Sequence, residues 1–134
     1  MVLQTTQLVL REMTEADLPT LCAILQDPEV MYAYAHAFSD AEVQEWLAKQ
    51  QKRYREDGFG LWSVVCKENG QMIGQCGLTW QNWKGGQVLE IGYLFAKEHW
   101  HQGYATEAAI ACRHYAFETL GAQEVFSIIR TNNI

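Results

Sequence analysis

The second half of the chain alternates strand-forming runs with tight-turn signals, and this pattern restricts the fold more than any other feature. Apolar β-forming runs at residues 61–67, 72–80 and 88–95 are separated by Asn69-Gly70 and by a glycine-rich turn at residues 84–87. An Asn-Gly pair favours a two-residue type I′ hairpin turn, because both central positions of that turn need a positive φ. The three runs are therefore predicted to form an antiparallel meander.

A helix and one more strand are predicted after the meander. Apolar residues recur at helical spacing between Gly103 and Leu120, and Gly121 is expected to end this helix in the left-handed conformation. Residues 124–129 then form another apolar run typical of a buried strand. A strand that follows its predecessor through a helix runs parallel to it with a right-handed crossover.

The segment before the meander is predicted to contain one strand and two helices. The strand covers residues 7–12, and capping boxes at Thr14 and Ser39 open the helices, which end at Asp27-Pro28 and near Gly58. Residues 31–38 show no clean period and predict a loop or a short helix. The whole order predicts an α/β (α+β) fold, with a mixed, mostly antiparallel sheet flanked by helices.

Composition bounds the class of function. The 134 residues correspond to one domain, and 10 Lys+Arg against 16 Asp+Glu give a net charge of −6. The basic residues are scattered, and the run from Lys49 to Arg55 is interpreted as a solvated helix end, so no nucleic-acid partner is expected. No signal-peptide pattern and no apolar run near the ~18 residues of a membrane span are present, which predicts a cytoplasmic protein without a membrane partner.

The cysteines and histidines do not form a recognisable reactive site. None of the four cysteines belongs to a CxxC pair, and each lies in an apolar stretch, so they are predicted to be small buried hydrophobic residues in a reducing compartment. Cys112 falls inside a helix without a placeable partner and is not expected to act as a nucleophile. The four histidines lack HxxxH and HExxH spacing, so no metal site is expected.

The turn between the 88–95 run and the helix at Gly103 carries the most informative residues, which read EHWHQGYATEAA at positions 98–109. Such a turn leaves unpaired backbone N–H groups at a helix N-terminus, which bears about half a positive charge and binds phosphate. Gly103 lets the backbone approach a ligand, and Ala105 keeps the next position small. The run contains neither the GK[ST] element of a P-loop nor the GxGxxG of a dinucleotide site.

Residues 100–108, which read WHQGYATEA, resemble the acetyl-CoA-binding motif of the GCN5-related N-acetyltransferases (GNATs). Within that superfamily the chain resembles the ribosomal-protein (Rim-type) N-terminal acetyltransferases, through short matches at residues 8–17, 27–30, 74–78 and 90–93. Trp100 departs from the Gln or Arg that the superfamily prefers there, a departure common in this branch. The resemblance implies a GNAT fold and acetyl-CoA-dependent acetylation of a primary amine, in this branch a protein α-amino group.

The resemblance also implies where acetyl-CoA binds. Its pyrophosphate would contact the backbone N–H groups of residues 101–106, and its pantetheine arm would pair with the end of the preceding strand. A backbone N–H near Leu94 would polarise the thioester carbonyl. The acetyl-CoA-binding residues predicted in this way are Tyr93, Leu94, Phe95, His101, Gln102, Gly103, Tyr104, Ala105 and Thr106.

Glu90 is the predicted catalytic base, because the attacking amine must lose a proton and Glu90 shares one face of its strand with Gly92 and Leu94. The alternative is a carboxylate paired structurally beside a neighbouring strand. Glu107 is expected to cap its helix or to form a buried hydrogen bond rather than to catalyse. An aromatic wall around the acceptor is predicted from three residues, with plain core packing as the alternative: Tyr32, Tyr34 and Trp80.

Two other functions stay open beside acetylation of a protein N-terminus. The chain could acetylate a small amine or an antibiotic, or it could be a catalytically inactive CoA-binding or interaction module. Family members continue with a further helix and two strands, so the domain at residues 1–134 is expected to lack these elements and the acid that protonates the leaving thiolate. The run at residues 125–129 would then be an apolar sheet edge that invites homodimerisation.

Overall fold

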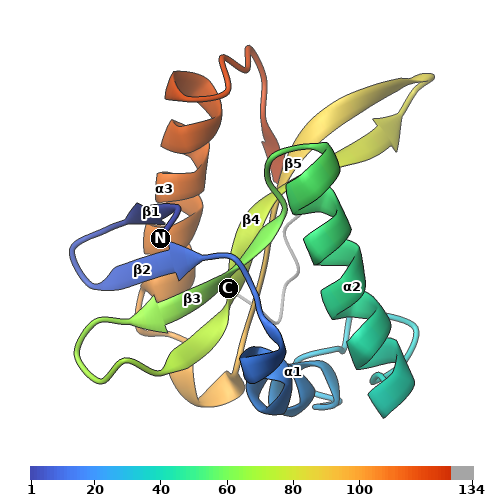
Figure 1. Cartoon of the computed structure of the whole chain (residues 1–134), viewed down its shortest axis with the longest axis vertical. Helices are drawn as coiled ribbons and strands as arrows, with labels where there is room; N and C mark the ends of the chain where they lie inside the picture. Colours follow the sequence, from blue (N-terminus) through green and yellow to red (C-terminus); the bar gives the residue numbers. More distant parts are fainter. Residues whose placement is uncertain (128–134) are drawn as a thin grey trace.

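The computed structural model describes residues 1–127, whose strands lie side by side in chain order in one six-stranded sheet (Figure 1). Every neighbouring pair is antiparallel except β5 and β6, which are parallel. This arrangement confirms the predicted mixed, mostly antiparallel sheet. The strands are β1 (Leu3–Gln4), β2 (Leu8–Arg11), β3 (Leu61–Cys66), β4 (Met72–Trp83), β5 (Gly86–Phe95) and β6 (Phe126–Ser127).

Helices cover both faces of this sheet, with α3 on one face and α1 and α2 on the other (Figure 1). The elements are α1 (Leu18–Leu25), α2 (Asp40–Glu56) and α3 (Tyr104–Glu118), with short 3₁₀ turns η1 (Glu15–Asp17) and η2 (Lys97–His99). The capping box at Ser39 forms as predicted, since the Ser39 hydroxyl accepts from the Glu42 N–H at 3.2 Å. Residues 31–38 form turns rather than a helix.

The predicted type I′ turn at Asn69-Gly70 is wrong. Gly70 has a positive φ of 70°, whereas Asn69 does not, and Cys66 pairs with Gln71 across a four-residue loop. The Asn69 side chain instead accepts from the Gln71 N–H at 3.0 Å, which stabilises a different turn. A two-residue turn with two positive φ values does occur, but between β4 and β5, at Lys84 (48°) and Gly85 (79°).

Four strands differ clearly from the prediction. β1 was not predicted, and β4 and β5 are both longer than their apolar runs, so their hairpin projects beyond the rest of the sheet (Figure 1). The run at residues 124–129 contributes only Phe126–Ser127 within the described residues, and positions 128 and 129 lie outside them. Phe126 is 45% exposed at this side of the sheet.

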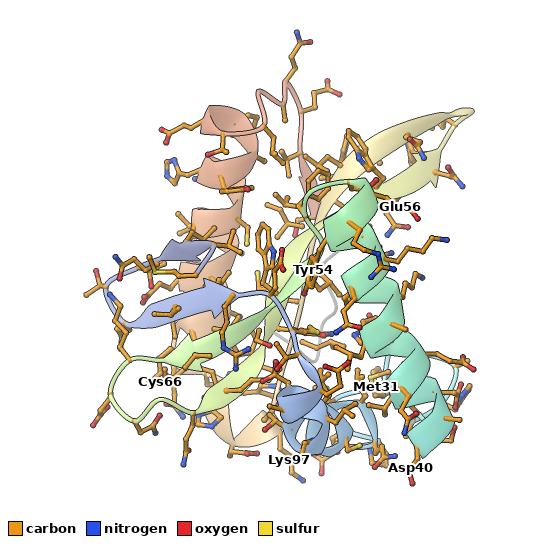
Figure 2. All side chains as sticks on the ribbon, viewed as in Figure 1. Met31, Asp40, Tyr54, Glu56, Cys66 and Lys97 are labelled. Carbon is orange, nitrogen blue, oxygen red and sulfur yellow. The ribbon has the colours of Figure 1, made fainter. Side chains whose placement is uncertain are left out.

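The core consists of two apolar clusters, one on each face of the sheet. Trp62 is buried against α3, where its ring meets Tyr115 edge-on at a centroid distance of 5.2 Å. Tyr54 extends from α2 toward the sheet (Figure 2) and packs against the cluster that contains Trp62, and its hydroxyl donates to the Leu61 carbonyl and accepts from the Met13 N–H. These bonds fix α2 against β3, and α2 forms one wall of a cleft described below.

A buried carboxylate anchors the start of the helical layer. Asp17 is 4% exposed and accepts two hydrogen bonds from the Arg11 guanidinium, at 2.8 and 2.9 Å, together with bonds from the Ser63 hydroxyl and the Thr14 N–H. Burial alone would raise the pKa of Asp17, but these four bonds outweigh it and hold the pKa below its usual value. The carboxylate therefore stays ionised and ties η1 to β2 and β3.

Candidate active site

The turn that joins β5 to α3 is held closed by a tryptophan. The Trp100 indole N–H donates to the Phe95 carbonyl at 2.8 Å, which brings the end of β5 next to the start of α3. The chain then passes through two residues of positive φ, His101 at 62° and Gly103 at 85°. The one departure from the superfamily motif thus has a structural function that the sequence pattern did not reveal.

The N-terminus of α3 presents backbone donors to an open space. Gly103 is the N-cap and has no side chain to offer, and the first intrahelical bond runs from the Glu107 N–H to the Gly103 carbonyl. The N–H groups of residues 104–106 therefore have no intrahelical acceptor. A Cβ atom on Gly103 would meet nothing within 4 Å, so an anion can approach these groups directly.

A hollow of about 60 Å³ lies in front of this helix end, which we call the donor hollow. It brings together most of the predicted acetyl-CoA-binding residues, together with His99 and Trp100. The predicted residues that line it are Tyr93, Phe95, His101, Gly103, Tyr104, Ala105 and Thr106. Gln102 is turned away, because its side-chain amide donates to the Glu98 carbonyl at 3.0 Å, and Leu94 lies on the other face of β5.

Within residues 1–127, one edge of β5 is open beside the donor hollow. β5 pairs with β4 along its entire length, but with β6 only at Glu90 and Ile91. Among residues 1–127, positions 92–95 have no strand on that side. Backbone N–H and C=O groups on an open edge can pair with an extended ligand in the manner of an added strand.

A second cleft, of about 230 Å³, lies on the other face of β5, and we call it the acceptor cleft. Glu90, Gly92 and Leu94 line it from β5, as the alternation of the strand predicts. The Glu90 Oε1 atom lies 3.6 Å from the place where a Cβ on Gly92 would stand, so the carboxylate leans along β5 in the direction of Leu94. The remaining lining residues are Tyr34, Trp46, Lys49, Arg53, Leu61, Gln75, Thr79, Gln81 and Tyr93.

The three predicted aromatic residues separate in the structure. Tyr34 lines the acceptor cleft. Tyr32 is 73% exposed and lies outside the cleft lining, and Trp80 is 42% exposed with its ring 6.0 Å from that of Phe59. Trp46 of α2 lines the cleft instead, next to the Phe38 ring at a centroid distance of 5.6 Å.

Two basic residues of α2 were interpreted from the sequence as a solvated helix end, but the structure places them at the acceptor cleft. Lys49 and Arg53 are one helical turn apart and both line the cleft. Burial lowers the pKa of the Lys49 amine, and the nearby Arg53 charge lowers it further. Burial also lowers the pKa of Arg53, although Asp57 and Glu90 act in the opposite direction. The sequence signal for this placement was their spacing from Trp46 at i+3 and i+7, which puts all three residues on one face of the helix.

Glu107 forms the structural contacts expected of it. Its carboxylate accepts from the Thr5 hydroxyl and from both the backbone N–H and the side-chain amide of Gln7, the latter two at 2.9 Å. Burial would raise the pKa of Glu107, but these bonds hold the pKa below its usual value. Glu107 therefore fastens the segment between β1 and β2 to α3.

Three of the four cysteines, Cys66, Cys76 and Cys112, are buried as predicted, whereas Cys22 is only half-buried. All four are free, and the Sγ atoms of Cys76 and Cys112 lie 3.6 Å apart in the core. The contact with Cys112, together with burial, raises the pKa of the Cys76 thiol. In the part of the chain that the structure describes, no group of three or more His, Cys, Asp or Glu residues could hold a metal ion. Within residues 1–127, no helix has the length and apolar character needed to cross a membrane.

Comparison with known proteins gives consistent matches. The model of the acetyltransferase (GNAT) domain matches residues 7–134. The uncharacterized protein YkkB of Bacillus subtilis is 36% identical over 98% of this chain and 77% of its own length. An Aspergillus fumigatus protein named FsC-acetyl coenzyme A-N(2)-transacetylase is 34% identical over 81% of this chain and 49% of its own. The crystal structure of an Agrobacterium tumefaciens acetyltransferase superposes with a TM-score of 0.83 at 27% identity, covering 98% of this chain and 75% of that one.

Proposed function

Because this chain belongs to the acetyltransferase (GNAT) family, we propose that it transfers the acetyl group of acetyl-CoA to a protein N-terminal α-amino group. The observation that carries the proposal is the adjacency of the donor hollow, the open edge of β5 and the acceptor cleft. Each supplies one requirement of the reaction: an anion site, a groove for an extended arm, and a place for the amine. The Rim-type matches in the sequence favour a protein N-terminus as the acceptor.

Acetyl-CoA is proposed to bind along β5. Its pyrophosphate accepts hydrogen bonds from the free N–H groups at the start of α3, where the small Gly103 and Ala105 allow close approach. Its pantetheine amides pair with the open edge at residues 93–95. The thioester then lies near Leu94, between the donor hollow and the acceptor cleft. The thioester carbonyl oxygen accepts a hydrogen bond from a nearby backbone N–H.

The reaction is proposed to proceed by direct attack of the amine on the thioester carbon. An α-amino group has a pKa of about 8, so much of it is protonated at neutral pH and a base assists the attack. The Glu90 carboxylate, directed toward Leu94 in the acceptor cleft, accepts that proton directly or through one water molecule. A C–N bond forms and the C–S bond breaks. One proton of the ammonium group moves to Glu90, and the second proton that the amide product no longer carries goes to the CoA thiolate, which leaves as the thiol.

A small amine is the second candidate for the acceptor. The Aspergillus relative is named for an N(2)-transacetylase reaction and is 34% identical to this chain. The matched region covers about half of that relative's length. A polar cleft such as the one in this chain can hold either kind of acceptor. The alternatives differ only in which amine yields product.

The experiment is an acceptor screen that follows the release of CoA thiol, comparing Ala- and Ser-starting peptides with polyamines and aminoglycosides. We expect a peptide to give the highest kcat/KM. The variant Glu90→Gln should lower kcat about 100-fold and displace the acidic limb of the pH profile. Glu56→Gln, an exposed carboxylate on α2 outside both sites, is the matched control (Figure 2). No thiol release with any amine would reject the proposed function, and an unchanged pH profile would reject Glu90 as the base.

A further inference from the structure

The acceptor cleft is rich in hydrogen-bond donors and positive charge. Lys49 and Arg53 bring two positive charges to the cleft lining. Among the described residues, Glu90 is the one carboxylate that lines the cleft with them. The ion pairs found among residues 1–127 involve other cations, namely Arg11, His36, Lys52 and Lys97. Arg53 donates to the Gln50 side-chain oxygen at 3.0 Å through Nη1, which leaves further guanidinium N–H groups for a ligand. This local charge is notable in a chain of net charge −6.

Gln75 adds a buried donor to the same cleft. Its side chain is 1% exposed, and its Oε1 accepts from the Trp46 indole N–H at 2.9 Å. Because an indole N–H can only donate, this bond fixes the orientation of the Gln75 amide. The Gln75 Nε2 atom has no hydrogen-bond partner within the described residues, although a buried amide N–H normally has one. An acceptor oxygen on a bound molecule would satisfy it.

We propose that the acceptor amine carries a carboxylate, which is held by Lys49, Arg53 and the Gln75 amide while the amine lies between Glu90 and Leu94. This inference rests on the proposed function and adds the substrate class: an amine with a carboxylate a few bonds away. Such a carboxylate is available on an acidic side chain near a peptide N-terminus or on a free amino acid. Arg and Lys recognise a carboxylate through charge-assisted hydrogen bonds, and Gln can add a third.

The two cations are not placed to bind the phosphates of acetyl-CoA. Lys49 and Arg53 lie on α2, which packs on the face of the sheet opposite α3. The donor hollow opens at the start of α3 and is lined by neither residue. β5 therefore separates these cations from the anion site, and a loss of either cation should act on the acceptor rather than on acetyl-CoA.

The test compares acceptors that differ only in a carboxylate. Peptides beginning Ser-Asp and Ser-Glu are assayed against Ser-Asn and Ser-Gln, and free α-amino acids against their amides, which separates the two sources of the carboxylate. In one of the two series, the peptides or the free amino acids, we expect the acceptor with the carboxylate to have a KM lower than that of its amide partner by about tenfold or more. Arg53→Gln and Lys49→Gln should each remove most of that preference, with kcat changed less than the KM and acetyl-CoA affinity unchanged. Lys52→Gln, an exposed position on the same helix, should retain the preference.

Binding without turnover separates this inference from the proposed function. The quenching of Trp46 fluorescence by each acceptor reports occupancy of the cleft whether or not acetyl transfer follows, and a Trp46→Phe variant identifies its signal. Preferential binding of acidic acceptors without any thiol release would reject the proposed function and keep the inference. Thiol release with equal KM values for acidic and amide acceptors would reject the inference and keep the function. Equal effects of Arg53→Gln and Lys52→Gln would also reject it.

Discussion

Gly103→Ala tests whether the start of α3 binds the acetyl-CoA pyrophosphate. Gly103 has a φ of 85°, and an added Cβ would meet no protein atom within 4 Å. The substitution therefore costs backbone strain without a clash inside the protein. A left-handed Ala costs about 1–2 kcal/mol, and the smaller entropy of the unfolded chain offsets part of that cost. We expect a net loss of about 1 kcal/mol, or roughly 3–5 °C in Tm for a domain of this size.

Gly121→Ala is the matched control at the other end of the same helix. Gly121 also has a positive φ, of 70°, and its Cβ would likewise meet nothing within 4 Å. The strain should therefore be similar, and the two variants should lose similar stability in thermal unfolding followed by circular dichroism. Gly121 does not line the donor hollow, so its substitution should leave acetyl-CoA affinity unchanged.

Acetyl-CoA affinity then separates the two variants. In Gly103→Ala the new methyl group occupies the space through which a phosphate oxygen reaches the free N–H groups, so calorimetry should show a Kd at least about tenfold higher, or 1.4 kcal/mol. Gly103→Glu, which adds charge repulsion, should abolish binding. Equal affinities in Gly103→Ala and Gly121→Ala, at equal losses of stability, would refute the assignment of the anion site.

Three further substitutions test the scaffold by urea denaturation. Gly77→Ala places a Cβ 2.0 Å from the Gly60 carbonyl oxygen and should cost about 3 kcal/mol or prevent folding, whereas Gly86→Ala, whose nearest atom is 4.0 Å away, should cost little. Asp17→Ala should cost about 3–5 kcal/mol of unfolding free energy, because it leaves the partners of a buried carboxylate unpaired. Folding lowers the pKa of Asp17, so its contribution to stability is complete above the unfolded pKa of about 3.9. The wild type should lose this contribution as the pH falls through the lower pKa of the folded state. Glu107→Ala should cost about 1–2 kcal/mol by releasing the segment after β1, and a loss below 0.5 kcal/mol would contradict that attachment.

The sequence predicted those parts of the fold that depend on local signals. Apolar runs identified β2 to β5, and the Ser39 capping box identified the start of α2. The turn at Asn69-Gly70 failed because the type of a hairpin turn depends on the strand register as well as on its residues. The pairing of Cys66 with Gln71 leaves four residues to close the loop, and a two-residue turn cannot fit there. β1 is only two residues long, too short to produce a periodic signal.

The candidate site was predicted unevenly for a related reason. The donor hollow follows one contiguous motif, so the sequence located most of its lining. The acceptor cleft draws side chains from α2, β4 and β5, which are far apart along the chain. Lys49 and Arg53 therefore looked like a solvated helix end, because only the packing of α2 against the sheet brings them beside Glu90. Tyr32 was predicted beside the acceptor together with Tyr34, which is close to it in the sequence. The two are only two positions apart, yet Tyr32 lies on the surface and Tyr34 lines the cleft.

The alternation of β5 explains how one strand can serve two sites without mixing their chemistry. Phe95 lines the donor hollow alone, Glu90, Gly92 and Leu94 line the acceptor cleft alone, and Tyr93 between them borders both. The proposed anion site at the start of α3 thus lies on the face opposite Glu90, which would keep that carboxylate away from a bound pyrophosphate. A shift of one residue in the pairing of β5 with β4 would turn Glu90 to the face on which Leu89 and Ile91 are buried, and so remove its carboxylate from the acceptor cleft. The ten-residue pairing between these strands, continuous from Gly74 with Phe95 to Trp83 with Gly86, therefore sets which side chains of β5 are available to the proposed chemistry.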